Sequence, residues 1–362
     1  MPYASAMSEP PQEPSPGRVV RTLQDGFWDL TEVIELADGS LRVRKRSKGA
    51  TAERPWGPES LRREIRYLQS ATPEAAVALP RLLAWWDRPG VNGPEVGYEM
   101  PFYPDHRDAG TLARAGALAQ EEIDIFQGEL ADVVFARLHE PAGEHESLFA
   151  HMVGAVRQAF DGLVGDPAFA ALINAERIEL NGGRVLGPRA VFESIVRNTN
   201  MRDLIDGTRA VRLHGDLHLE NILWRPLAVE GAEPRLLLID PVSVAGVVWG
   251  LPLWDLVKYE SYATGELMAL RSERIEVAGF GEGRGVYRCR VRTEDPGLAP
   301  FLARNWHALF RAVFISQHGR VDERAYRFIH GYFNAAMALN TTGLQRQGRL
   351  LRATEDFNAV LV

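Results

Sequence analysis

Three polar residues in the middle of the chain have the types and the spacing needed to handle a hydroxyl group and metal-bound phosphates. Asp216 precedes the carboxamide Asn221 by five residues, and a second carboxylate, Asp240, follows an apolar run. Carboxylate and carboxamide oxygens are good ligands for Mg²⁺, and a carboxylate can also orient a hydroxyl or accept its proton. The pattern therefore predicts phosphoryl transfer, with Asp216 acting on the hydroxyl and with Asn221 and Asp240 holding the metal.

Two short strands are expected to position these side chains. Residues 222–224 leave the loop as a strand, and residues 235–239 form a second strand that delivers Asp240. Two prolines and a glycine lie between the strands and favour a hairpin connection. Both metal ligands are therefore expected at adjacent strand ends. The alternative is a chance turn with an asparagine nearby, and the agreement of spacing, strand context and order along the chain disfavours it.

The motifs resemble those of a known group of enzymes. The chain has His-Gly-Asp at 214–216 and Ile-Asp-Pro at 239–241, where protein kinases have His-Arg-Asp and Asp-Phe-Gly. This resembles the aminoglycoside phosphotransferase and choline kinase group of small-molecule kinases, over roughly residues 18–362, with the specific motifs confined to 211–260. The resemblance implies a two-lobed protein-kinase-like fold, ATP or GTP as donor, Mg²⁺, and a small-molecule hydroxyl as acceptor. It also implies that His214 braces the loop.

A lysine that binds the donor phosphates is predicted on an N-terminal strand. Leu41, Val43 and Lys45 alternate with arginines, so their side chains share one face of the strand. Only three lysines occur among the 41 basic residues of the chain, which leaves few alternatives to Lys45. Arg44 would point to the opposite face. The alternative interpretation is that Lys45 is one more solvated charge in a basic run.

A helix with an acidic residue is expected to follow this strand. Leu61, Ile65 and Leu68 recur at helical spacing within residues 58–68, and Glu64 lies beside that apolar stripe. The corresponding helix of a kinase presents its glutamate to the phosphate-binding lysine. The alternative is a surface glutamate that pairs with arginine at helical spacing.

The segment after the N-terminal strands is predicted to link two lobes and to face the adenine ring. Backbone groups near Glu99 would pair with the edge of the base, and Met100 or Phe102 would pack on its face; plain core packing is an equal alternative. The loop expected to cover the phosphates has a single glycine, Gly26, which we interpret as a turn residue first and as a phosphate contact second.

These elements together predict an α+β fold with two lobes. We expect a disordered tail over 1–17, a nucleotide-binding lobe with an antiparallel sheet and a helix over 18–101, and a mostly helical catalytic and acceptor-binding lobe over 102–362. A helical insertion is expected over 164–209. The glycine-dense stretch 279–285 is predicted to be a hairpin tip, because no helix opens after it as a phosphate-binding loop would require.

Composition is typical of a cytoplasmic enzyme. The net charge of −7 argues against a nucleic-acid partner. No apolar run approaches the roughly 20 residues of a membrane span, so no membrane partner is expected. The single cysteine, Cys289, excludes an intramolecular disulfide and fits a reducing cytosol.

Charge near the C-terminus bears on the acceptor. Residues 301–362 contain eight arginines and four acids, which favours a neutral or anionic acceptor unless the arginines are only solvated helix faces. The predicted acceptors are a sugar, an aminoglycoside-like antibiotic or a nucleoside-like metabolite. The rival class is a catalytically silent nucleotide-binding regulator with the same fold. A protein kinase is disfavoured because the chain has neither Asp-Phe-Gly nor an Ala-Pro-Glu segment.

Overall fold

The chain forms two compact units. The computed structural model describes residues 12–26, 29–48, 57–90, 93–141, 147–197, 199–231, 234–242 and 246–362. The first unit falls within residues 1–109, 132–138 and 214–248, and the second within residues 110–131, 139–213 and 249–362. The first unit therefore contains both the N-terminal sheet and the segment from His214 to Asp240. The lobe boundaries expected from the sequence stay a prediction, because these units divide the chain in another way.

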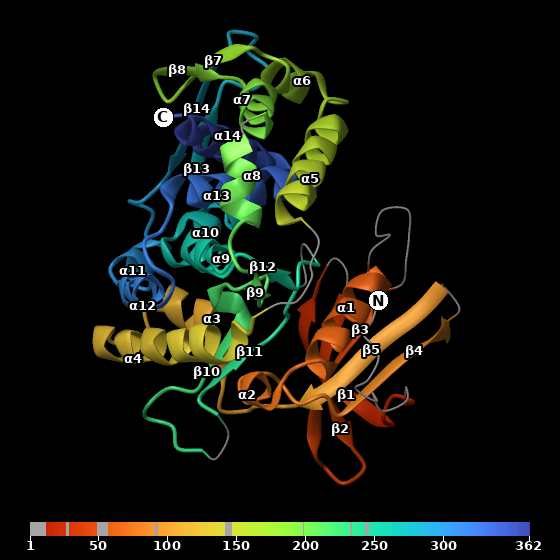
Figure 1. Cartoon of the computed structure of the whole chain (residues 1–362). Helices are drawn as coiled ribbons and strands as arrows, with labels where there is room; N and C mark the ends of the chain where they lie inside the picture. The colour runs from red at the N-terminus through yellow and green to blue at the C-terminus, as the bar shows by residue number, and fades with distance from the viewer. Residues whose placement is uncertain are drawn as a thin grey trace. The chain divides into compact units, whose positions relative to one another are not determined.

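An antiparallel sheet of five strands is the main part of the first unit (Figure 1). The strand order is β1-β2-β3-β5-β4, and each neighbouring pair is antiparallel. The strands are β1 (Gly17–Asp25), β2 (Asp29–Leu36), β3 (Leu41–Ser47), β4 (Ala84–Gly90) and β5 (Gly93–Pro101). The predicted N-terminal antiparallel sheet is confirmed. Gly26 lies between β1 and β2, while Phe27 and Trp28 of that connection lie outside the described residues.

Helix α1 (Gly57–Gln69) packs on this sheet, and the short helix α2 (Pro73–Ala76) follows it. The apolar side chains of α1 and of the sheet form one buried cluster: Val43, Leu61, Ile65, Val96, Tyr98 and Met100. Burying an aliphatic side chain of this size contributes about 1.5–3 kcal/mol, so the stripe that predicted the helix also fixes it against the sheet. Glu64 lies beside that stripe and is only 1% exposed.

A smaller sheet in the first unit carries the segment predicted to hold metal. Its order is β11-β10-β6, with both pairs antiparallel. The strands are β6 (Arg107–Asp108), β10 (Ile222–Trp224) and β11 (Leu236–Leu238), and β10 has the predicted bounds. A π-helix, η1 (Asp132–Leu138), and a 3₁₀ helix, η2 (Leu219–Asn221), complete the unit. The sequence pattern did not predict β6 or the change of η1 from α-helical to π-helical geometry.

The second unit is mostly helical. The long helices α13 and α14 lie side by side in it (Figure 1). Its helices are α3 (Ala109–Arg114), α4 (Gln120–Ala131), α5 (Leu148–Leu163), α6 (Pro167–Ile173), α7 (Pro188–Val196), α8 (Thr199–Asp206), α9 (Leu253–Ala263), α10 (Glu266–Arg271), α11 (Ala299–Leu302), α12 (Ala308–His318), α13 (Glu323–Leu339) and α14 (Gly343–Val360). The predicted α+β class is confirmed.

Strands also occur in the second unit. They are β7 (Arg177–Leu180), β8 (Gly183–Leu186), β9 (Val211–Arg212), β12 (Trp249–Gly250), β13 (Ile275–Ala278) and β14 (Val286–Val291). The predicted hairpin around the glycine-dense stretch is confirmed as β13–β14. The insertion expected to be helical contains α6, α7 and α8, but it also contains the β7–β8 hairpin. Strand β7 pairs in parallel with β14, a long-range contact that local periodicity does not reveal.

No helix within the described ranges combines the length and the apolar character that crossing a membrane requires.

Candidate functional site

The β10–β11 pair brings Asn221 and Asp240 together. Ile222 faces Leu238 across the ladder, and the Ile239 amide donates a hydrogen bond of 2.9 Å to the Asn221 carbonyl. Asn221 therefore lies at the start of one strand, and Asp240 lies one residue past its partner on the other strand. This is the arrangement of adjacent strand ends that the sequence predicts.

The backbone around Asp240 has an unusual conformation. Asp240 has a φ of 55° and Val242 a φ of 52°, both in the left-handed region. Aspartate tolerates this region better than most residues, whereas a β-branched valine is strained there, and such strain concentrates at functional sites. Hydrogen bonds to His214 hold the turn: its carbonyl accepts from the Val242 amide at 2.7 Å, and its Nε2 lies 3.0 Å from the Ile239 carbonyl. His214 thus braces the turn that carries Asp240.

Gly215 fits a position that a larger residue would not. Its φ is 82°, and a Cβ built there would lie 2.8 Å from the Val247 carbonyl oxygen and 3.3 Å from the Val242 Cα. A side chain at this position would therefore need backbone movement as well as a strained conformation. The local packing explains why the motif is His-Gly-Asp in this chain and not His-Arg-Asp.

Asp216 and Asn221 are joined directly. The Asn221 Nδ2 donates to the Asp216 carbonyl at 3.0 Å and to its carboxylate Oδ2 at 3.3 Å. Both residues are buried, with 3% and 7% of their surface exposed. Because both acceptors are oxygens, the amide must present its nitrogen to Asp216, and its Oδ1 is then the atom that can face a cation.

Lys45 lies among three carboxylates. Its Nζ is 3.0 Å from Glu64 Oε2, 2.9 Å from Asp240 Oδ1 and 3.7 Å from Asp29 Oδ2. One ammonium therefore joins β3, α1, the start of β2 and the turn after β11. Arg44 points to the opposite face, where it contacts the Glu99 carboxylate at 2.8 Å. The strand alternation predicted from the sequence matches these positions.

The charges in this cluster are strongly perturbed. Burial by itself lowers the pKa of Lys45, but the carboxylates of Asp240 and Glu64 outweigh it, so its pKa lies well above its usual value and Lys45 is a cation. Burial raises the pKa of Glu64 to about 7, although Lys45 acts in the opposite direction. Burial also raises the pKa of Asp29. The cluster is therefore a compact charge site from which water is mostly excluded.

The sequence did not predict two members of the cluster, Tyr98 and Asp29. The Tyr98 hydroxyl donates a 2.6 Å hydrogen bond to Glu64 Oε1, and Tyr98 is only 1% exposed. Asp29 contacts Lys45 as described above. The alternation of side chains along each strand places both on the same face of the sheet as Lys45. Tyr98 pairs directly with Lys45 across the β3–β5 ladder. Thr31 pairs with Lys45 across the β2–β3 ladder, and Asp29 lies two positions before Thr31 on the same face. Finding them required knowledge of which strands pair.

The residues expected at the adenine have other contacts. The Glu99 carboxylate pairs with Arg44 and, at 3.2 Å, with Arg42, while its carbonyl accepts from the Leu83 amide at 2.8 Å. Met100 belongs to the core cluster between α1 and the sheet, and Phe102 packs against that cluster. The equal alternative, plain core packing, therefore describes Met100 in this structure. A role of these residues in adenine binding stays a prediction.

Part of the segment expected to be a tail also contacts the sheet. Residues 1–11 lie outside the described residues. The Gln12 amide donates to the Trp85 carbonyl at 2.7 Å, and the Ser15 amide donates to Glu99 Oε1 at 3.0 Å. These contacts place residues 12–15 beside β4 and β5.

The donor atoms near Asp240 fit a hard cation. Asn221 Oδ1 and the Asp240 carboxylate are oxygen ligands of the kind that Mg²⁺ binds. Within the described ranges, no group of three or more His, Cys, Asp or Glu side chains is arranged to hold a metal. A site of the kinase type does not need one, because phosphate oxygens and water supply most of the coordination. The residues therefore fit a magnesium ion.

Ion pairs account for part of the positive charge near the C-terminus. Arg311 pairs with Glu260 and Glu323, and Arg352 pairs with Glu266. Two of these acids, Glu260 and Glu266, come from outside residues 301–362. The arginine excess of that region is therefore partly neutralised within the second unit and does not decide the charge of an acceptor.

No family model and no curated protein matches the chain. Solved structures with a similar course of the chain include a glucosamine kinase with glucosamine, ADP and phosphate (12% identity, 96% of this chain and 94% of that chain, TM-score 0.42). A macrolide 2'-phosphotransferase from Brachybacterium faecium also matches, with 16% identity, 93% of this chain and 91% of that chain covered, and a TM-score of 0.40. An amicoumacin kinase with AMP-PNP and Ca²⁺ matches with 10% identity, 94% and 87% of the two chains covered, and a TM-score of 0.41.

By name, these proteins are kinases or phosphotransferases of small molecules, the group that the motifs of this chain resemble. At identities of 10–16% and TM-scores of 0.40–0.48, the matches do not decide what this chain does. The case for a function rests on the residues of the site.

Proposed function

We propose that the protein is a small-molecule kinase that transfers the γ-phosphoryl group of ATP or GTP to a hydroxyl of a small acceptor. The observation that carries this proposal is the position of the Lys45 Nζ, 3.0 Å from Glu64 and 2.9 Å from Asp240. This position brings together Lys45, which is suited to bind the donor phosphates, Glu64, which orients Lys45, and Asp240, the carboxylate proposed to bind the metal. Asn221 and Asp216 are connected to that cluster through the β10–β11 ladder and the Asn221 amide.

Each residue then has one task. Asp216 orients the acceptor hydroxyl and takes its proton, while Lys45 neutralises the donor phosphates and Glu64 holds Lys45 in place. Asn221 and Asp240 would hold Mg²⁺, which supplies charge neutralisation between the phosphates when it is bound. Positioning and electrostatic stabilisation then provide most of the rate enhancement.

Donor binding requires an exchange of partners at Lys45. In the structure its ammonium contacts the same Asp240 carboxylate that would face the metal. Phosphate oxygens would have to replace Asp240 as a partner of Lys45, and Asp240 would then be available to the cation. Glu64 can remain on Lys45 throughout, because the Tyr98 hydroxyl holds its carboxylate independently of Asp240.

The acceptor class is a sugar, an aminoglycoside-like antibiotic or a nucleoside-like metabolite, and the enzyme is expected in the cytoplasm. The alternative is a catalytically silent nucleotide-binding regulator. The presence of Asp216 together with Asn221 and Asp240 favours the enzyme, since a protein that only binds nucleotide does not need a residue to activate a hydroxyl.

A donor-consumption screen tests the proposal. The purified protein is incubated with Mg²⁺ and with ATP or GTP, together with sugars, aminoglycosides, nucleosides and choline-like amines. We expect at least one acceptor class to raise donor consumption well above the rate without acceptor, with formation of an O-phosphorylated product. The matched control is Asp216→Asn, which should lose this increase. Nucleotide binding without acceptor-dependent consumption across these classes would favour the silent regulator.

A further inference from the structure

A small, partly enclosed cavity in the second unit lies among α9, α10, α13 and α14. Leucine and phenylalanine side chains form part of its lining, and the polar lining comes from Lys258, Ser261, Glu266, His330, Asn334 and Arg349. It offers about 10 Å³ of free space to a water-sized sphere, which is enough for about one water molecule or an ion of similar size. None of these residues belongs to the proposed phosphotransfer site.

Arg349 is the least satisfied charge at this cavity. It is 3% exposed, and its contact in the described part of the chain is a 3.3 Å hydrogen bond from Nη1 to the neutral amide oxygen of Asn334. Its Nε has no hydrogen-bond partner there. Burial, and then the charge of Arg271, lower the pKa of Arg349 to about 9, although Glu266 acts in the opposite direction. The side chain is thus still a cation at neutral pH, in a place where an unpaired charge is costly.

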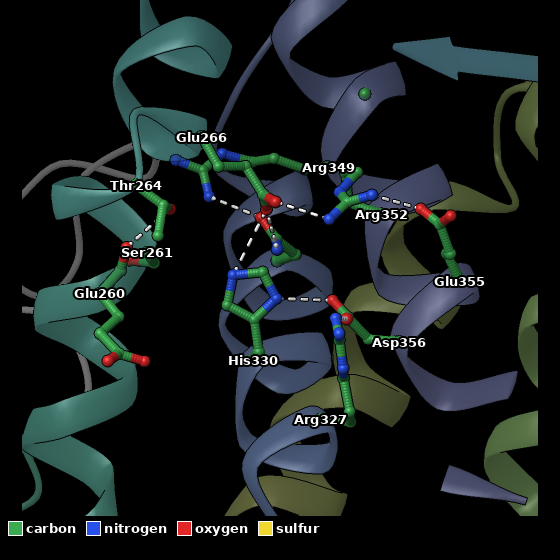
Figure 2. A network of polar contacts seen from close by, with 12 residues as sticks. Glu260, Ser261, Thr264, Glu266, Arg327, His330, Arg349, Arg352, Glu355 and Asp356 are labelled. Atoms are coloured by element: carbon green, nitrogen blue, oxygen red, sulfur yellow. Dashed lines mark hydrogen bonds and ion pairs between the residues drawn. The ribbon is translucent and has the colours of Figure 1, made fainter. Parts of the chain in front are cut away.

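The acids around Arg349 are already occupied by other cations (Figure 2). Glu266 Oε2 lies 2.6 Å from Arg352, and its Oε1 lies 3.3 Å from His330. Asp356 lies 2.6 Å from the other ring nitrogen of His330. Burial by itself lowers the pKa of His330, but Asp356 and Glu266 outweigh it, so the pKa is raised and the ring tends to carry a positive charge.

The cluster therefore has an excess of positive charge. Four cationic side chains face three acids in it, namely Arg327, His330, Arg349 and Arg352 against Glu266, Glu355 and Asp356. Glu266 is the one acid among the described residues that line the cavity. A water molecule could accept a hydrogen bond from Arg349, but it would leave this charge excess unbalanced.

We propose that the cavity binds a single small monovalent anion of about the size of chloride, held by the Arg349 guanidinium between Lys258 and His330. The cavity volume restricts the ligand to this size, because a phosphate or an organic carboxylate is several times larger than a water molecule. The bound anion would balance the buried charges and tie α14, which carries Arg349, to α9 and α13. The site is thus structural and independent of the phosphotransfer reaction.

Anion-dependent thermal unfolding tests the proposal with the full chain. The melting temperature is measured at fixed pH and equal ionic strength in sodium chloride, in sodium bromide and in sodium gluconate, whose anion is too large for the cavity. A ligand that binds only the folded state raises the melting temperature with the logarithm of one plus the ratio of ligand concentration to Kd, by about 2 °C at ten times its Kd for a chain of this length. We expect chloride and bromide to give this increase over gluconate.

Two variants locate the effect. Arg349→Met removes the cation and keeps the length of the side chain, so the difference between chloride and gluconate should disappear. Arg324→Met, on α13 and outside the cavity lining, should keep the difference. If Arg349→Met does not fold, anomalous scattering from a bromide-soaked crystal of the wild-type protein replaces it, with a peak expected beside the Arg349 guanidinium. Equal melting temperatures in chloride and gluconate for the wild type, or water alone in the cavity of the bromide-soaked crystal, would overturn the proposal.

Discussion

At the scale of single residues, Asp216 and Lys45 have separable tasks in the proposed reaction. Asp216 contacts the Asn221 amide, and Lys45 contacts Glu64 and Asp240. A change at Asp216 should therefore affect the acceptor hydroxyl and spare the donor phosphates. A change at Lys45 should do the reverse. Substitution of each residue can distinguish these roles by separate readouts.

Asp216→Asn should slow transfer by roughly 100-fold or more while donor affinity stays nearly unchanged. The amide keeps the shape of the side chain but cannot accept the proton of the hydroxyl. Turnover with the best acceptor and donor affinity by calorimetry are the two measurements. A parallel collapse of donor binding would show that Asp216 is a metal or structural residue.

Lys45→Ala should weaken donor binding and slow transfer, because the cation that faces the phosphates is lost. Lys45→Arg should restore only part of the function, since a planar guanidinium does not replace a compact ammonium among three carboxylates. Arg44→Ala is the matched control on the opposite face. It should lower stability, because it removes a partner of the buried Glu99 carboxylate, while the folded protein keeps its donor affinity. Loss of donor binding in Arg44→Ala alone would contradict the assignment of Lys45.

At the scale of elements, the site depends on how β5 holds α1. The Tyr98 hydroxyl on β5 donates to Glu64 on α1, and Glu64 in turn contacts Lys45 on β3. Tyr98 thus connects two elements at the point where the donor phosphates are expected. We regard it as a positioning residue, since it acts through Glu64.

Tyr98→Phe should weaken donor binding by a factor of several to about tenfold, because a hydrogen bond to a charged group contributes about 1.5–3 kcal/mol and only part of it bears on the orientation of Lys45. The loss should grow as the pH falls toward about 7, since the Tyr98 hydrogen bond favours the ionised form of Glu64 and the variant therefore protonates first. Donor affinity at several pH values, compared with wild type, provides the measurement. A uniform loss of stability with unchanged donor affinity would assign Tyr98 to the core alone.

The raised pKa of Glu64 predicts how the stability of the protein depends on pH. Burial raises its pKa from 4.5 to about 7 in the folded chain. Between these values the folded state retains a proton that the unfolded state has lost, so the contribution of Glu64 to stability falls as the pH rises, by at most about 1.4 kcal/mol per pH unit, and levels off above about 7. The difference in free energy of unfolding between wild type and Glu64→Gln should show this slope. A difference that increases with pH would mean that Lys45 dominates and lowers the pKa.

Local sequence patterns predicted the individual strands and the helix of the site better than they predicted which strands and side chains lie next to one another. The apolar run before Asp240 and the strand after Asn221 were recognisable because each is bounded by turn residues. The stripe of Leu61 and Ile65 likewise predicted α1. Tyr98 and Asp29 were missed because their roles depend on which strands are neighbours, and one strand gives no information on that. The parallel β7–β14 pair was missed for the same reason, since it joins segments about a hundred residues apart.

At the scale of the whole molecule, donor binding should couple to global stability. A magnesium nucleotide that binds only the folded state raises the melting temperature, and omission of Mg²⁺ should reduce the increase. In Asp240→Asn the magnesium-dependent part should disappear and transfer should be nearly abolished, because a metal-ligand charge is lost. Thermal unfolding with and without Mg²⁺ measures this. A magnesium effect of wild-type size in Asp240→Asn would remove Asp240 from the metal site.

The charge excess of residues 301–362 does not decide the acceptor, because net charge over a segment does not show which charges are paired. Arg311 and Arg352 contact acids that lie outside the segment in which the excess was counted. Composition alone does not reveal ion pairs of this kind.

The scarcity of lysine has a practical consequence for covalent probes. Amine-reactive reagents attack the neutral amine. The carboxylates around Lys45 keep its side chain protonated, and Lys45 is only 3% exposed. Lys258 is 5% exposed, whereas the side chain of Lys48 is 25% exposed. A general acylating reagent should therefore label Lys48 first among the side-chain amines of the free protein. An inhibitor designed to bond covalently to Lys45 must first displace Asp240 from the Lys45 ammonium, and the ammonium must then lose a proton. Electrophiles carried on a nucleotide-like scaffold are therefore the suitable starting point.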